Sequence, residues 1–160
     1  MREQALFIDG SVDTKSKTGI GAYLFLDEIS QVQVDQNEIR LKRFEDTSST
    51  KLELQTLLWA VEETGPKNCS FTVYTDSQNI VSLPGRQARL QESEFQNRSG
   101  RPIRNRDLYQ EFYSMLDSHN CRFEKVEGHQ AQSKKGQIET IFTLVDRAAR
   151  AELRRILKPQ

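Results

Sequence analysis

The alternation of hydrophobic and polar positions divides the chain into short strands and amphipathic helices. The run Ala5 to Ile8 is apolar throughout, which is typical of a central strand, and the run Gly19 to Leu26 predicts a second strand. Residues Gln31 to Phe44 alternate and predict a third strand with a break near Asp35-Gln36-Asn37. Short connections between these runs favour an antiparallel meander.

The remainder of the chain switches between helical and extended patterns. Leu54, Leu57, Leu58 and Val61 are spaced as the apolar stripe of a helix, with N-cap candidates at Ser48 to Thr50 and an end at Gly65-Pro66. The later predicted elements are a strand at Phe71–Thr75, a short helix at Ser77–Leu83 ended by Pro84-Gly85, a polar Arg-rich stretch to Arg106, a helix carrying Leu108, Phe112, Met115 and Leu116, a strand at Cys121–Val126, and a final helix from Ile141 to Ile156. This order predicts an α/β fold, a five-stranded mixed sheet with an antiparallel meander on one side, parallel strands on the other, and helices on both faces.

Composition narrows the class of protein. The 160 residues suit a single domain over 1–160, and 23 basic residues balance 23 acidic ones, which argues against a highly basic chromatin-type protein. No apolar run approaches the roughly 18 residues of a membrane helix, and no signal peptide is evident. Cys69 and Cys121 form no CxxC motif. We therefore expect a monomeric cytoplasmic protein with reduced thiols and no membrane contact.

Four carboxylates suggest a catalytic site. Asp9 ends the first predicted strand, Asp76 ends the fourth, Glu53 lies in the first turn of a helix, and Asp146 flanks the apolar stripe of the last helix. Sites in open α/β sheets lie beyond the carboxyl ends of strands, so these side chains are expected to converge. Mg²⁺ relieves the repulsion between clustered carboxylates. Two such ions about 3.5–4 Å apart support phosphodiester hydrolysis.

Each carboxylate also has a purely structural interpretation. These interpretations are a turn for Asp9-Gly10, a capping box for Glu53 with Thr50, an N-cap for Asp76, and a solvated position for Asp146 beside Arg147 and Arg150. The metal-site hypothesis requires all four of these structural interpretations to be wrong at once.

Short motifs in a fixed order then identify a family. They are Ile8-Asp9-Gly10-Ser11, Gly19-Ile20-Gly21-Ala22-Tyr23, Leu52-Glu53-Leu54, Tyr74-Thr75-Asp76-Ser77-Gln78, Val126-Glu127-Gly128-His129 and Val145-Asp146-Arg147-Ala148-Ala149-Arg150. Over nearly the whole chain this set resembles ribonuclease H of the type 1 family, as does the segment Arg101 to Tyr109. The resemblance implies an endonuclease that hydrolyses the RNA strand of RNA–DNA hybrids and leaves 3′-OH and 5′-phosphate ends.

The resemblance also implies roles for individual residues. Asp9, Glu53, Asp76 and Asp146 would hold two Mg²⁺ ions, or Mn²⁺, and His129 would assist proton transfer or product release. The implied contacts to the hybrid are Gly10, Ser11, Ser49, Thr50, Gln78, Arg86, Arg89, Arg98, Arg101, Arg104 and Asn105. The last six lie in an Arg-rich insertion around 85–106, where six arginines outnumber Glu92 and Glu94 and suit phosphate binding.

The chain departs from the family pattern at three places. First, Ser49-Thr50 stand where the family often carries an Asn pair. Second, the stretch from His129 to Asp146 is longer than is usual in the family and lacks the usual Asn-Glu before the last aspartate. Third, the Arg-rich segment is built differently from the family's basic protrusion, and Lys134-Lys135 are a second candidate phosphate contact. The alternatives are a catalytically impaired hybrid-binding module, a related metal-dependent exonuclease, integrase or resolvase, and a small-ligand α/β protein. The filled acidic positions and the absence of a Gly-rich phosphate loop argue against the first and last of these.

Overall fold

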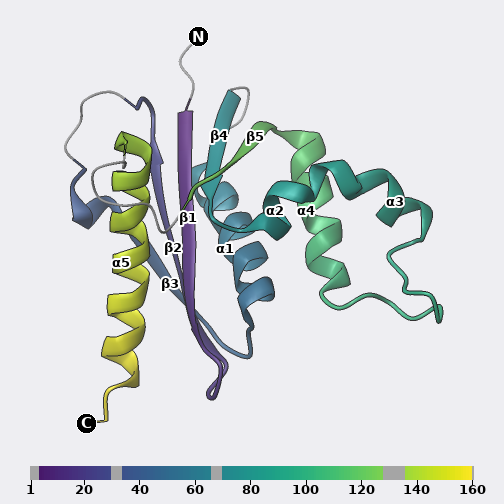
Figure 1. Ribbon diagram of the computed structural model, residues 1–160, viewed down its shortest axis with the longest axis horizontal. Helices are drawn as coiled ribbons and strands as arrows, with labels where there is room; N and C mark the ends of the chain where they lie inside the picture. The colour runs from purple at the N-terminus through teal and green to yellow at the C-terminus, as the bar shows by residue number, and fades with distance from the viewer. Residues whose placement is uncertain (1–3, 30–33, 66–69, 128–135, 160) are drawn as a thin grey trace.

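A five-stranded mixed sheet forms the centre of the protein (Figure 1). The computed structural model describes residues 4–29, 34–65, 70–127 and 136–159. The strands are β1 (Gln4–Asp13), β2 (Thr18–Leu26), β3 (Arg40–Phe44), β4 (Ser70–Thr75) and β5 (Asn120–Lys125), in the spatial order β3-β2-β1-β4-β5. β2 is antiparallel to β1 and β3, whereas β4 is parallel to β1 and β5. The predicted meander and the mixed sheet are confirmed.

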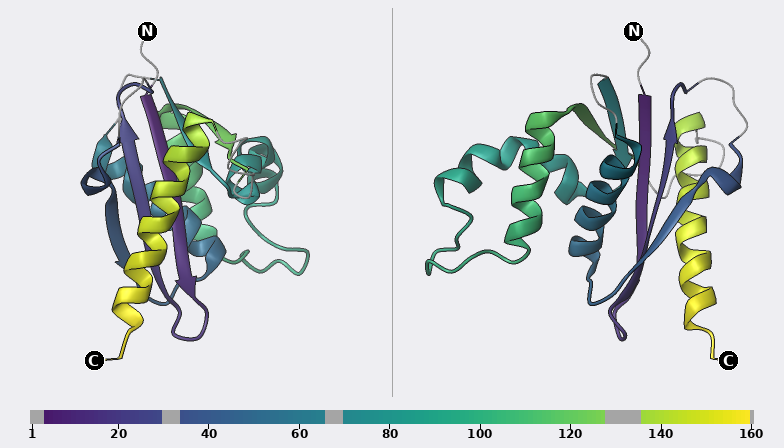
Figure 2. Two further views of the ribbon diagram at one scale, coloured as in Figure 1. Left: turned by 60° about the vertical axis from the view of Figure 1, so that its left-hand side comes forward. Right: turned by 180° about the vertical axis from the view of Figure 1, so that it is seen from behind.

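Helices cover both faces of this sheet. They are α1 (Ser49–Thr64), α2 (Gln78–Ser82), α3 (Gln87–Glu92), α4 (Arg106–Ser118) and α5 (Gln137–Leu157), with single 3₁₀ turns η1 (Gln36–Glu38) and η2 (Pro84–Arg86). Figure 2 shows α5 alone on one face and α1 on the other, with α4 packed outside α1. None of the helices in the described part of the chain is long and apolar enough to cross a membrane.

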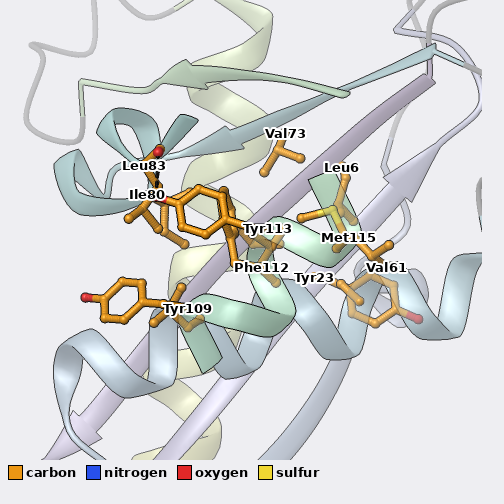
Figure 3. Packing of buried hydrophobic residues seen from close by; sticks show 14 of the residues in the cluster. Leu6, Tyr23, Val61, Val73, Ile80, Leu83, Tyr109, Phe112, Tyr113 and Met115 are labelled. Carbon is orange, nitrogen blue, oxygen red and sulfur yellow. Dashed lines mark hydrogen bonds between the residues drawn. The ribbon is translucent and has the colours of Figure 1, made fainter. Parts of the chain in front are cut away.

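The alternation of side chains along β1 creates two hydrophobic cores. Leu6 and Ile8 point toward α1 and α4, whereas Ala5 and Phe7 point toward α5. The first core, shown in Figure 3, also anchors the region after β4, since the Tyr113 hydroxyl on α4 donates a 2.7 Å hydrogen bond to the carbonyl of Leu83. The central strands β1, β2 and β4 therefore carry the buried residues of the sheet, and the Tyr113 hydrogen bond connects the segment after β4 to α4.

Three sequence predictions need correction. Asp9 does not end β1, because the strand continues to Asp13 as one arm of a hairpin with β2. The third strand is only Arg40–Phe44, since residues 36–38 form a 3₁₀ turn; Gln31 to Gln33 lie outside the described residues. The short helix α2 does end before Pro84-Gly85 as predicted, but the polar stretch expected after it is not wholly irregular, because Pro84 begins η2 and α3 follows it.

Candidate active site

Two aspartates meet where parallel strands part. The β1–β4 ladder ends with the pair Phe7 and Tyr74. Two residues further along each strand come Asp9, which stays in the β1–β2 hairpin, and Asp76, which follows the last residue of β4. The same register therefore places the two carboxyl groups at one level of the sheet, where repulsion from Asp76 raises the pKa of Asp9.

Asp9 is the most perturbed acid of the site. Burial is the main cause that raises its pKa to about 9, and a hydrogen bond to the side chain of Asp146 and the charges of Asp76 and Asp146 add to it. Burial and the neighbouring acids thus favour the protonated form of the Asp9 carboxyl, in which a proton can be shared with the side chain of Asp146. The Oδ2 atom of Asp9 is buried and has no hydrogen-bond partner among the described residues.

Asp146 reaches this cluster from the opposite face of the sheet. It lies on α5, half-buried at the margin of the apolar stripe that packs on β1 and β2. The Nε atom of Arg150, one helical turn later, donates to Oδ1 of Asp146 over 3.1 Å. The solvated interpretation of Asp146 is therefore wrong in part: it pairs with Arg150 and also contacts Asp9.

Glu53 enters the cluster from α1. The N-cap of this helix is Ser48, whose hydroxyl accepts from the amide of Lys51, so the capping box between Thr50 and Glu53 is not formed. Instead, Ser77 Oγ donates a 2.6 Å hydrogen bond to Oε2 of Glu53. Burial raises the pKa of Glu53, the Ser77 hydrogen bond opposes this, and the charge of Asp76 adds to it.

Glycines in the hairpin allow α1 to approach closely enough to bring Glu53 to β1. A Cβ atom on Gly10 would lie 2.8 Å from Leu52 Cδ2, and one on Gly21 would overlap the hydroxyl of Thr56. A larger residue at either position would force the facing side chain of α1 to move, and at Gly21 the short Thr56 side chain leaves little room for this. These two glycines belong to the motifs that carry the family resemblance, and the structure gives them a packing role.

A cavity of about 150 Å³ opens between these elements. Its lining combines three of the predicted carboxylates with small and polar groups, namely Asp9, Glu53, Asp76, Gly10, Ser49 and Thr56, together with Ile8, Val12 and Leu52. Within the described ranges, no group of three or more His, Cys, Asp or Glu side chains is arranged to hold a metal ion as it stands. His129 and Lys134-Lys135 lie outside the described residues.

The remaining predicted contacts fall into two places. Gly10 and Ser49 line the cavity, Ser11 follows on β1, and Thr50 and Gln78 are exposed in the first turns of α1 and α2. The predicted arginines instead lie on the segment from η2 to α4. Arg89, Arg98, Arg101 and Arg104 are exposed there, whereas Arg86 is half-buried and donates to Oδ1 of Asn79 over 3.1 Å.

Asn105 lies at the junction between this segment and α4. Its backbone is left-handed, with φ of 62°, and its side chain makes no cap hydrogen bond. It adjoins a hollow of about 460 Å³ that Lys51 and Arg106 also line. The structure thus places Asn105 beside two cations rather than in the carboxylate cluster.

Ser77 is a site residue to which the sequence pattern gave no role. The hydroxyl accepts from the amide of Ile80 and so provides the N-cap of α2, a position that was predicted for Asp76. A serine directly after a strand-end aspartate is a recognisable cap signal. Its bond to Glu53 on a distant helix is a tertiary contact that local patterns do not reveal.

Comparison with known proteins agrees with this architecture. The family model for RNase H matches residues 1–153. A ribonuclease H of Caldicellulosiruptor saccharolyticus is 28% identical over 158 residues, covering 96% of this chain and 98% of that protein. A ribonuclease H of Clostridium botulinum is 24% identical over 132 residues, covering 81% of this chain and 85% of its own.

Solved structures show the same fold at low sequence identity. The solution structure of the PFV RNase H domain superposes with a TM-score of 0.74 at 17% identity, covering 94% of this chain and 93% of that domain. A foamy viral protease-reverse transcriptase in complex with an RNA/DNA hybrid gives a TM-score of 0.71 at 10% identity, covering 94% of this chain and 20% of that one. With the family model matching nearly its whole length, the chain belongs to the RNase H family of hydrolases.

Proposed function

We propose that this protein is an endonuclease that hydrolyses the RNA strand of RNA–DNA hybrids, leaving 3′-OH and 5′-phosphate ends. The observation that carries the proposal is the convergence of Asp9, Asp76 and Asp146 from two strands and a helix, with Glu53 held nearby by Ser77. Packing alone gives no reason to gather three further acids around the buried carboxyl of Asp9, because each raises the cost of ionising the next. One structural neighbour was solved with an RNA/DNA hybrid, which supports the substrate class.

The residues present fit a divalent metal centre. All four side chains offer hard oxygen donors, and the unpartnered Oδ2 of Asp9 is a buried acceptor that a cation would satisfy. We propose that Asp9, Glu53, Asp76 and Asp146 hold two Mg²⁺ or Mn²⁺ ions after their side chains reorient, since they are not preassembled for an ion. When bound, such ions supply an activated water and neutralise charge on the leaving oxygen.

The protein contributes orientation and charge around these donors. Ser77 fixes the Glu53 carboxylate, and Arg150 restrains Asp146. Loss of the Asp9 proton makes that carboxylate available to a cation, so Asp9 must ionise before the site is complete. His129, on the polar segment before α5, is proposed to transfer a proton to or from the reacting phosphate group or to assist product release.

Substrate recognition is proposed to use two groups of residues. Gly10, Ser11, Ser49, Thr50 and Gln78 surround the carboxylates and would contact the RNA strand, whose 2′-hydroxyls distinguish it from DNA. The insertion around 85–106 would contact phosphates through its exposed arginines and Asn105. Phosphate contacts of this kind position the duplex without reading its sequence.

Cleavage of a strand-labelled RNA–DNA hybrid tests the proposal, with RNA–RNA and DNA–DNA duplexes alongside, in Mg²⁺, Mn²⁺ or EDTA. We expect cutting of the hybrid's RNA strand only, dependence on the metal, and a loss of at least about 10³-fold in Asp9→Asn. Asp117→Asn is the matched control, because Asp117 is an exposed α4 aspartate outside the cluster. Hybrid binding without cutting by the unmodified protein would support the binding-module alternative instead, and DNA cutting would support a related nuclease.

A further inference from the structure

We propose that the outer face of α5 is a second nucleic-acid-binding surface, which contacts the sugar–phosphate backbone of substrate that extends beyond the hydrolysed hybrid. The surface, named here the α5 basic stripe, consists of Arg147, Arg150, Arg154 and Lys158. The identity of the ligand as nucleic acid rests on the proposed function, but the stripe itself rests on the observations that follow.

Helical spacing places Arg147, Arg150 and Arg154 on one face of α5, and Lys158, the C-cap residue directly after the helix, continues the same spacing. Successive members are separated by three, four and four residues, which aligns them along a helix of 3.6 residues per turn. All four are exposed, and the opposite face of α5 buries Val145, Ala149 and Leu153 against the sheet. At 1.5 Å per residue the stripe is about 16 Å long, which matches several phosphates along a strand.

Acidic side chains on α5 leave most of this charge uncompensated. Asp146 pairs with Arg150, and Glu152 pairs with Arg155 at 2.5 Å, beside the stripe. Arg147, Arg154 and Lys158 form no ion pair with any described residue. Because the whole chain has zero formal net charge, this is a local concentration of positive charge rather than a property of the composition.

The helix dipole accounts for only part of the stripe. Cations in the last turn, such as Arg154, stabilise a helix C-terminus. Arg147 and Arg150 lie near the middle of this 21-residue helix, where the dipole effect has decayed. Arg150 is paired with Asp146, but Arg147 has no ion pair among the described residues, and an anionic partner would satisfy its charge.

The position of the stripe relates it to the catalytic cluster. It begins directly after Asp146 and continues toward the C-terminal end of α5. Figures 1 and 2 show α5 on the opposite side of the sheet from the segment between α3 and α4, which carries the exposed Arg98, Arg101 and Arg104. Nucleic acid bound at the carboxylates would thus have basic surface on both sides.

The stripe fits a polyanionic strand better than a membrane surface. An interfacial helix needs an exposed apolar face beside its cations. On α5 the apolar residues pack on the sheet. Among the large hydrophobic side chains of the described part of this helix, only Leu157 at its end is exposed, at 43%. Arginine guanidinium groups in a row are suited to phosphate oxygens.

Equilibrium binding measured in EDTA tests the proposal without requiring cleavage. The test variant is Arg147→Gln/Arg154→Gln/Lys158→Gln; Arg150 is retained because it contacts Asp146. The control variant, Arg40→Gln/Lys42→Gln/Arg43→Gln, removes the same charge from exposed positions of β3. The ligands are a short hybrid, the same hybrid with a single-stranded DNA extension, the same hybrid with a duplex DNA extension, and phosphatidylserine vesicles.

We expect the test variant to bind an extended hybrid about tenfold more weakly than the unmodified protein. We also expect the slope of log K against log salt concentration to become shallower by about 2–3, since each lost phosphate contact removes about 0.9 from the slope. The pattern across the two extensions identifies whether the backbone is single-stranded or duplex. An equal loss in the β3 variant, unchanged binding of every nucleic acid, or a loss confined to vesicles would overturn the proposal. If the unmodified protein bound extensions through the stripe but cut no hybrid, the stripe would stand and the proposed function would fall.

Discussion

The hydroxyl of Ser77 joins the Glu53 carboxylate on α1 to the N-terminus of α2. Its proton is donated to Glu53 over 2.6 Å, while its oxygen accepts from the amide of Ile80 over 3.1 Å. One buried side chain therefore caps a helix and orients a member of the carboxylate cluster. The position of Glu53 relative to Asp76 depends on this bridge, since Ser77 directly follows Asp76 in the chain.

Replacing Ser77 by Ala should weaken both connections. Loss of the cap should cost about 1 kcal/mol of stability. The pKa of Glu53 should rise further, because the Ser77 hydrogen bond is the interaction that lowers it. We expect hybrid cleavage to fall about tenfold, equivalent to about 1.4 kcal/mol, with a greater loss at low pH. Ser82→Ala, in the same short helix, is the control, and equal pH–rate profiles for both variants would contradict this role.

Replacing Gly21 by Ala tests how α1 is placed. The new Cβ would overlap Oγ1 of Thr56 and lie 3.2 Å from Thr56 Cβ, so the helix that carries Glu53 must shift. We expect a loss of about 1–3 kcal/mol in the free energy of unfolding and a parallel loss of cleavage. Thr56→Ala in the same molecule should restore part of both, since the overlapping hydroxyl is then gone.

The control for this substitution is Gly85→Ala, because a Cβ at Gly85 would meet nothing within 4 Å. Denaturant unfolding gives the stability of each variant. Full stability and activity in Gly21→Ala would show that α1 can retreat without consequence for the site.

The strands and long helices were predictable because their residues carry strong periodic signals. The Leu54–Val61 stripe and the apolar run Ala5 to Ile8 pack as expected. The extension of β1 past Asp9 was not predictable from apolar periodicity, since it is held by hairpin pairing with β2. Likewise α3 was not predictable, since it buries only Leu90, which is too little for an amphipathic pattern.

The carboxylate cluster was predictable in outline and not in detail. Parallel strand ends explain why Asp9 and Asp76 meet, even though Asp9 lies within its strand. Two contacts join residues on different elements: Asp9 with Asp146, and Ser77 with Glu53. A third, between Arg150 and Asp146 on α5, depends on which rotamers the two side chains adopt. Such choices depend on packing, which a local pattern does not contain.

The raised pKa of Asp9 makes the stability of the metal-free protein depend on pH. A proton is bound more tightly by the folded state, whose Asp9 pKa is about 9, than by the unfolded state with its ordinary value of 3.8. The stabilisation from this proton is complete below about pH 4 and is lost as pH rises toward 9. In EDTA we therefore expect Tm to fall as the pH rises from about 4 to about 9, because the folded state progressively loses this contribution from Asp9.

Asp9→Asn should remove this pH dependence and raise Tm in EDTA at neutral pH, by about 2–4 °C for each kcal/mol that the unmodified protein loses by keeping Asp9 protonated in the folded state. Mg²⁺ should raise the Tm of the unmodified protein more at pH 8 than at pH 5, because it binds the ionised carboxylate. Calorimetric scans at several pH values provide the measurement. A Mg²⁺ effect of equal size in Asp9→Asn would remove Asp9 from the proposed metal ligands.

The Arg-rich insertion has a preformed tip that also yields a prediction. Oδ1 of Asn97 accepts hydrogen bonds from the amide of Ser99, the hydroxyl of Ser99 and the amide of Arg101, at 3.0, 2.8 and 3.0 Å. The backbone amide of Asn97 in turn donates to the carbonyl of Arg101 over 2.8 Å. One side chain thus fixes the turn on which Arg98 and Arg101 are displayed.

Asn97→Ala should release this turn while leaving the cores intact, because Asn97 is exposed and contributes to neither. If the exposed arginines bind hybrid phosphates, disordering the turn adds an entropic cost to binding, and we expect affinity to fall about three- to tenfold, equivalent to about 0.6–1.4 kcal/mol. Asn97→Asp retains the acceptor and should keep the turn, losing only what its added negative charge costs near phosphate. Hybrid affinity in EDTA and Tm are measured for each variant. Unchanged binding in Asn97→Ala would place the arginines outside the hybrid interface. A lower Tm would show that the turn stabilises the fold rather than the bound substrate.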